Sequence, residues 1–145
     1  MDDIMHIFGK GTPAENRLSR VIRERVIEEA ATVGLDLIFT YVWNFSLDKG
    51  KQNIDRYKEI YEQKGGKVYF VELTASLAIR TQRAASLERH RQKPNTAGAE
   101  EVVEMEHTQR FESPKPFFYS EQYRYLDASD KTPQQIASEI ISWLG

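Results

Sequence analysis

Four arginines, Arg80, Arg83, Arg89 and Arg91, follow closely on an apolar stretch at residues 68–73. A guanidinium group is permanently charged, and its planar set of N–H donors matches the oxygen geometry of phosphate. A buried strand that ends beside such groups is typical of α/β proteins that bind phosphate. The spacing therefore predicts a phosphate-binding segment.

The alternative interpretation of these arginines is a solvated helix face, since charged side chains usually lie on helix surfaces. Arg80 and Arg83 are three residues apart, so they share one face of a helix, and they come directly after the apolar stretch. These two are the stronger candidates for contact with a phosphate. The glutamates of residues 100–106 are interpreted as a solvated helix face.

Length and composition indicate a single α/β domain over residues 1–145. Hydrophobic residues make up 40% and charged residues 29%, as in ordinary soluble globular chains. The formal net charge of −2 excludes a non-specific binder of nucleic acid polymers, which needs a basic excess, although a local basic patch is compatible with it.

Several classes of site and location are disfavoured by residue content. The chain has no cysteine for a disulfide or thiolate, and its three histidines lack metal-site spacing, so no metal ligand is assigned. Apolar runs are too short for a membrane helix. The acidic start, Met1-Asp2-Asp3, lacks the basic region of a signal peptide, which predicts a cytoplasmic protein.

Helix-like and strand-like segments alternate along the chain. Thr12-Pro13-Ala14-Glu15 and Thr132-Pro133-Gln134-Gln135 each carry the signature of a helix start. Residues 35–42 and 68–73 are nearly continuous in apolar and β-branched residues, as in strands covered on both faces of a parallel sheet. The predicted order is helix 12–34, strand 35–42, a helix ending near residue 64, strand 68–73, helix 76–91, helix 97–110, an irregular connection at 113–121, strand 123–128 and a helix from 132.

The first helix carries seven apolar residues that we expect to form one buried stripe. They are Leu18, Val21, Ile22, Val26, Ile27, Ala30 and Ala31.

This alternation predicts a three-layer fold, a parallel sheet with flanking helices. In such sheets ligands bind outside the carboxyl ends of the strands. The candidate site is therefore expected near Trp43-Asn44, Thr74-Ala75-Ser76 and Ala128-Ser129.

Several segments together resemble the P-loop small-molecule kinases, and most closely bacterial ATP-binding proteins labelled shikimate-kinase-like or AAA-type. They are Arg17-Leu18-Ser19, Ile22-Arg23-Glu24-Arg25, residues 37–43 and residues 68–73 with Arg80 and Arg83. The resemblance spans residues 2–144 and rests on the order and texture of the segments.

The resemblance implies a five-stranded parallel sheet, ATP and Mg²⁺ as cofactors, and a lid at about residues 89–112. It implies that Arg80, Arg83 and Ser129 border the nucleotide, with Arg89, Arg91 and Lys93 at the lid. It also implies that Arg23, Trp43 and Asn44 face a small-molecule or nucleotide phosphoryl acceptor. Asn44 stands where related chains often carry an acidic residue near the magnesium.

The chain departs from this family in one respect: it contains no Gly-x-x-x-x-Gly-Lys-[Ser/Thr] loop. That loop supplies backbone amides and a lysine to the phosphates and a hydroxyl to magnesium. Gly9-Lys10-Gly11-Thr12 is a poor match and is interpreted as a helix-entry loop. The family's first strand and loop would precede Met1, so the expected fold is P-loop-NTPase-like and N-terminally incomplete. A truncated piece, a misplaced start and a short natural variant are all compatible with it.

Three functional hypotheses follow. The first is an ATP-dependent phosphotransferase domain with negligible kinase activity as this chain alone. The second is a non-enzymatic binding or scaffold domain descended from that family, with a sheet edge open to a second copy and hence a homodimer. The third is a nucleoside-handling enzyme of flavodoxin-like topology, which would need a different phosphate loop.

Overall fold

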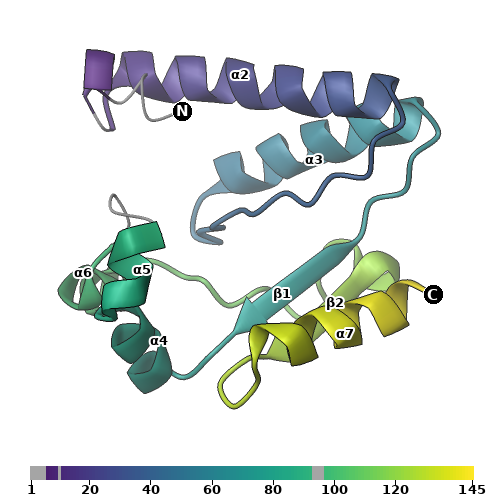
Figure 1. The fold of residues 1–145 in the computed structure, drawn as a ribbon. Helices are drawn as coiled ribbons and strands as arrows, with labels where there is room; N and C mark the ends of the chain where they lie inside the picture. Colours follow the sequence, from purple (N-terminus) through teal and green to yellow (C-terminus); the bar gives the residue numbers. More distant parts are fainter. Residues whose placement is uncertain (1–5, 10, 93–96) are drawn as a thin grey trace. The chain divides into compact units, whose positions relative to one another are not determined.

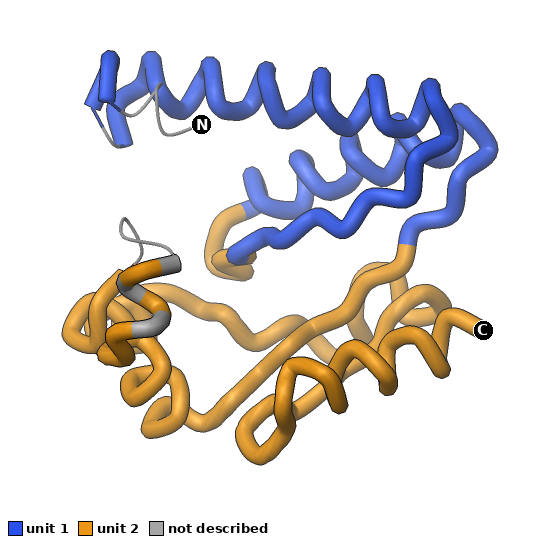
Figure 2. The backbone as a smooth tube through the Cα atoms, viewed as in Figure 1, with its two compact units in different colours: residues 1–42, 48–68 blue, residues 43–47, 69–145 orange. Residues whose placement is uncertain are grey.

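The computed structural model describes residues 6–9, 11–92 and 97–145, without the side chains of Glu88, His90 and Gln92. The chain divides into two compact units (Figure 2). Unit 1 comprises Met1–Val42 and Asp48–Val68, and unit 2 comprises Trp43–Leu47 and Tyr69–Gly145.

Unit 1 is built on two helices, α2 (Pro13–Thr32) and α3 (Asp48–Gln63) (Figure 1). Thr12 caps α2 as predicted, because its hydroxyl accepts a hydrogen bond from the Glu15 amide at 3.3 Å. The Glu15 carboxylate reaches the amide of Gly11, at 3.3 Å, and so closes a variant of the expected capping box. Gly34, at φ 67°, ends the helix in the left-handed region.

The packed faces of α2 and α3 form the core of unit 1. Its buried apolar residues are Ile27, Ala30, Ala31, Ile54, Tyr57 and Ile60. The prediction of one buried stripe along α2 is wrong for its first half, because Leu18, Val21, Ile22 and Val26 are exposed. At 3.6 residues per turn the seven apolar residues cover more of the circumference than one packed face can bury.

The predicted strand at residues 35–42 is wrong, since residues 35–44 have no strand pairing within the described part of the chain. Side chains attach this segment to α3. The Tyr61 hydroxyl donates to the carbonyl oxygen of Leu35 at 3.0 Å, and the edge of Phe39 contacts Tyr57 with ring centroids 5.5 Å apart. Strand propensity needs a neighbouring strand to be realised, and the described residues supply none here.

Unit 2 contains a two-stranded parallel sheet of β1 (Phe70–Thr74) and β2 (Tyr123–Asp127). The register pairs Phe70 with Tyr123 and Thr74 with Asp127. Both strands were predicted from the sequence to within two residues of their ends. The mixed α/β class and a parallel sheet are therefore present, while the three-layer, P-loop-like sheet remains a prediction.

The connection between the two strands is mostly helical. It contains α4 (Leu77–Ala84), α5 (Leu87–Gln92), α6 (Ala99–Thr108) and the 3₁₀ turn η1 (Ser120–Gln122). The predicted single helix at 76–91 is wrong, because it breaks between α4 and α5. At the break, hydrogen bonds of the Ser86 side chain compete with the backbone hydrogen bonds of a continuous helix. The Ser86 hydroxyl donates to the Arg83 carbonyl at 2.9 Å and accepts from the Arg89 amide at 3.3 Å.

The irregular segment after α6 supplies the core on one face of the sheet. Phe117 is buried and stacks on Tyr123, with ring centroids 4.4 Å apart. On the other side, α7 (Pro133–Leu144) begins with the predicted capping box, and Trp143 meets Tyr69 edge to face. None of the helices in the described ranges combines the length and apolarity that crossing a membrane requires.

Candidate functional site at the strand ends

The carboxyl ends of β1 and β2 are held together by backbone and serine hydrogen bonds. The Ala128 amide donates to the Thr74 carbonyl at 2.7 Å, and the Ser76 amide donates to the Ser129 hydroxyl at 3.0 Å. Ser76 also caps α4, accepting from the Ile79 amide. Ser129, predicted to border a nucleotide, therefore fixes the two strand ends to each other.

Asp127 shapes the turn that presents Ser129. Its Oδ1 accepts the Ser129 amide at 2.9 Å. Hydrogen bonds from the Ser129 hydroxyl and amide, with a smaller contribution from Lys131, lower the pKa of Asp127. The carboxylate therefore stays charged, and this turn keeps its geometry, through the neutral range.

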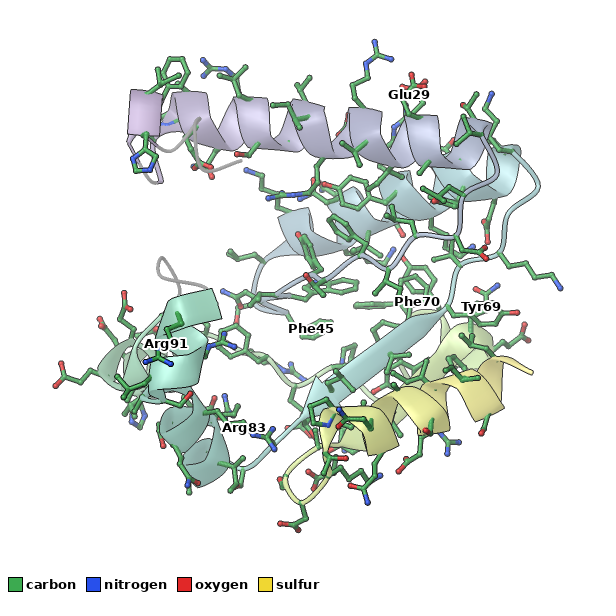
Figure 3. All side chains as sticks on the ribbon, in the orientation of Figure 1. Glu29, Phe45, Tyr69, Phe70, Arg83 and Arg91 are labelled. Atoms are coloured by element: carbon green, nitrogen blue, oxygen red, sulfur yellow. The ribbon has the colours of Figure 1, made fainter. Side chains whose placement is uncertain are left out.

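Arg83 reaches from α4 across to the end of β2. Its Nη2 donates to the carbonyl oxygens of Ala128, at 2.8 Å, and Ser129, at 3.3 Å (Figure 3). Within the described residues no carboxylate pairs with Arg83. Neutral carbonyls orient a guanidinium without cancelling its charge, so Arg83 presents an oriented, uncompensated positive charge at the strand ends.

Arg80 has a different set of partners. Its Nε donates to the Ala75 carbonyl at 3.0 Å, and its Nη2 lies 2.8 Å from Oε2 of Glu106 in α6. The four glutamates of residues 100–106 are exposed, as expected for a solvated helix face, and Glu106 makes this ion pair in addition. This ion pair joins α4 to α6, and a phosphate at Arg80 would compete with the Glu106 carboxylate. The separation of the two residues in the sequence left no local signal for the pair.

The other two arginines of the predicted cluster lie on α5, beyond the break at Ser86. Arg89 and Arg91 are exposed, and Figure 3 shows Arg91 on that short helix. The expected lid covers α5 and α6, and its Lys93 lies outside the described residues. The structure therefore places Arg80 and Arg83 at the strand ends and Arg89 and Arg91 on a separate element.

Trp43 and Asn44 belong to unit 2 but lie among aromatic residues on the sheet face. Trp43 stacks on Phe45 with ring centroids 4.6 Å apart, and it also stacks on Phe118. The Asn44 Oδ1 accepts from the amides of Ser46, at 3.0 Å, and Arg110, at 3.3 Å. Asn44 thus stabilises a turn and ties it to the segment after α6.

A partly buried polar cluster, which the sequence did not suggest, connects the two strands. The Tyr123 hydroxyl donates to Glu72 Oε2 at 2.5 Å, and Ser113 contacts both residues through its amide and hydroxyl. Burial, together with the hydrogen bond to Glu72, raises the pKa of Tyr123 to about 12. A lone glutamate in an apolar strand was the available signal, because a buried carboxylate needs a partner.

The third predicted acceptor residue, Arg23, lies in unit 1 on the packed face of α2. Its neighbours along that face, Ser19 and Ile27, are 5% and 2% exposed.

The implied cofactors fit the described residues unequally. Arg83 suits the phosphates of ATP. In the described ranges, however, no three His, Cys, Asp or Glu side chains gather closely enough to hold a metal ion, and Asn44 already accepts two backbone amides. The described residues therefore do not fit a protein-held Mg²⁺. Lys10, of the poor loop match, lies outside the described residues.

Comparisons with known proteins give no relative from which a role could be transferred: no family model, curated protein or solved structure matches the chain.

Proposed function

We propose that this chain is the nucleotide-binding part of a P-loop kinase-like phosphotransferase. The observation that carries the proposal is Arg83, anchored by the carbonyls of Ala128 and Ser129 and without a carboxylate partner in the described part of the chain. Its position at the carboxyl ends of two parallel strands is where ligands of α/β sheets usually bind.

In this proposal Arg83 binds the phosphates of ATP and offsets their negative charge. Ser129 keeps the loop after β2 in place, and Arg80 contributes when it exchanges Glu106 for a phosphate oxygen. Arg89 and Arg91 approach from the lid. The γ-phosphoryl group would pass to a hydroxyl of a small molecule or nucleotide, with charge stabilisation as the main catalytic contribution.

Turnover by these 145 residues alone is expected to be negligible, because the chain has no Gly-x-x-x-x-Gly-Lys-[Ser/Thr] loop. Binding is therefore the informative measurement. We suggest calorimetric titration of ATP, with and without magnesium, into the full chain. Saturable binding is expected to fall about tenfold or more in the variant Arg80→Ala plus Arg83→Ala, as loss of charge-assisted hydrogen bonds implies.

A matched control is the variant Arg25→Ala plus Arg56→Ala, which removes two exposed arginines that pair with glutamates on helices of unit 1. It removes the same charge and should leave ATP affinity unchanged. Equal losses in both double variants would show a non-specific charge effect, and no heat at millimolar ATP with a folded chain would overturn the proposal.

The second candidate is a scaffold domain that dimerises through the open edge of β1. The Thr74 carbonyl points toward β2, so the backbone groups of Val71 and Leu73 point to the opposite edge. Leu73 is 54% exposed, and an open apolar edge favours strand addition by a second copy. Sedimentation equilibrium tests this: a dimer dispersed by Leu73→Lys supports it, and a monomer across the concentration range contradicts it.

A further inference from the structure

Arg23 occupies an unusual position for an arginine. Ser19, Arg23, Ile27 and Ala30 follow one another along the face of α2 that packs in unit 1, and the other three are buried. None of the ion pairs of the described residues involves Arg23, and its neighbour Glu24 pairs with Arg20 at 3.5 Å. Among the residues that the structure describes, no carboxylate therefore forms an ion pair with Arg23.

Tyr57, on α3, presents a second unsatisfied group. Its side chain is only 6% exposed, and its hydroxyl is buried with no hydrogen-bond partner among the described residues. Burial raises the pKa of Tyr57, and Arg23 lies close enough to offset part of that rise. Buried hydroxyls nearly always have a partner, so an unpaired one indicates a missing group.

Two further polar groups lie nearby. Asn53 is one helical turn before Tyr57, and its Nδ2 donates to the Tyr41 hydroxyl at 3.4 Å. Phe39 closes the apolar side through its contact with the Tyr57 ring. Polar groups from α2, α3 and residues 35–42 thus gather in unit 1 around a cationic fork and a free hydroxyl donor.

We propose that Arg23 and the Tyr57 hydroxyl together bind an oxyanion, the carboxylate or phosphate group of a small molecule. The guanidinium fork supplies charge and paired donors, and the phenol supplies another donor at the buried end. The oxyanion would give the Arg23 guanidinium an acidic partner and the Tyr57 hydroxyl an acceptor. The oxyanion site lies within unit 1 and does not depend on the proposed nucleotide function.

The test is a ¹H–¹⁵N NMR titration of the full chain at constant ionic strength. Sodium phosphate and sodium acetate are added in separate arms, with neutral acetamide as the reference. Saturating shifts at the amides around Arg23, Asn53 and Tyr57 are expected, and the arm with the tighter affinity identifies the oxyanion. No saturable shift at these amides in either arm, with a dispersed spectrum, overturns the proposal.

Variants separate binding from packing. Tyr57→Phe removes one oxygen and should lower the affinity for the anion roughly fivefold. The midpoint of thermal unfolding should stay the same or rise, because an unsatisfied hydroxyl is lost. An unchanged affinity with a lowered midpoint would mean that the hydroxyl serves Arg23 structurally, and would overturn the proposal.

Arg23→Gln should lower the affinity for the anion about tenfold or more. If Arg23→Gln does not fold, Arg23→Lys, which keeps the charge but loses the planar set of donors, is measured in its place. The matched control is Arg25→Gln, because Arg25 is an exposed arginine that pairs with Glu28 on the same helix. The anion affinity of this variant should equal that of the parent chain. Equal losses in Arg23→Gln and Arg25→Gln overturn the site.

The two proposals fail separately. If no ATP binding is detected by calorimetry but phosphate or acetate still shifts the amides around Arg23, the proposed nucleotide function is wrong and the oxyanion site stands. The reverse result would remove the oxyanion site only. Arg83→Gln is expected to leave the shifts around Arg23 unchanged.

Discussion

The strand ends of unit 2 and the helix pair of unit 1 each hold an arginine that lacks an acidic partner in the described residues. Arg83 is exposed and oriented by two carbonyl oxygens, whereas Arg23 lies between buried side chains beside an unpaired phenol. Arg80 is the third case, because a carboxylate neutralises it. The difference teaches that the partner of an arginine, more than its presence, decides whether its charge is available to a ligand.

The largest effect is expected from breaking the packing of the α2 face on which Arg23 lies. Ile27→Ala removes a side chain that is 2% exposed and should lower the free energy of unfolding by about 2–5 kcal/mol. Val26→Ala, at the exposed neighbouring position, should cost well under about 1 kcal/mol. Urea unfolding followed by circular dichroism measures both. Similar costs would contradict the assignment of the buried face of α2.

An intermediate effect is expected from Tyr123, which lies on β2, the strand after which Arg83 binds the Ala128 and Ser129 carbonyls. Tyr123→Phe leaves Glu72 short of a buried donor and should cost about 1–3 kcal/mol. The pKa of Tyr123 is raised by burial and Glu72 to about 12, above its value of 10.0 when unperturbed. The stabilisation is therefore complete below pH 10 and is lost as the pH rises toward 12.

Unfolding measured at pH 9 and at pH 11.5 tests that dependence. The parent chain should lose stability between the two values, and Tyr123→Phe should lose less. Tyr125→Phe, an exposed tyrosine on the same strand, serves as the control and should follow the parent chain. A parallel decline in parent and Tyr123→Phe would mean that another group titrates.

The smallest effect is expected when Arg80 loses its carboxylate partner and so becomes, like Arg83, an arginine without an ion pair among the described residues. Glu106→Gln removes the carboxylate and should raise ATP affinity about two- to fivefold, at a cost in stability of at most about 1 kcal/mol, because the pair is partly exposed. Glu104→Gln, on the same helix, changes the charge equally without touching an arginine ion pair described here. Equal gains in both variants would indicate a general charge effect.

Local patterns in the sequence predicted much of the secondary structure. Helix starts at Thr12, Ser76 and Thr132 depend on neighbouring residues, and all three are observed as predicted. Residues 35–42 and β1 are equally apolar, yet only β1 is paired in the described structure. Pairing depends on another strand, and no local pattern can supply that partner.

In the candidate site, too, the features that depend on local sequence and strand order were predictable, and those that depend on tertiary packing were not. The clustering of Arg80 and Arg83 near Ser129 followed from the position of ligands at strand ends. The roles of Glu106 and Tyr57 could not be predicted from the sequence. Glu106 is the ion-pair partner of Arg80 from a helix distant in the sequence, and Tyr57 stands out only because its buried hydroxyl lacks a hydrogen bond. Both are properties of tertiary packing.

The segment at residues 35–42, which has no strand partner among the described residues, has a consequence for handling the protein. Ile38 is 94% exposed, and the run from Leu37 to Val42 contains no proline, no glycine and no charge. Such runs can stack into cross-β assemblies once their backbone is accessible to other chains. At high concentration, self-assembly into fibrils would start from this segment, and the amides of residues 37–40 would exchange with solvent deuterium faster than those of β2.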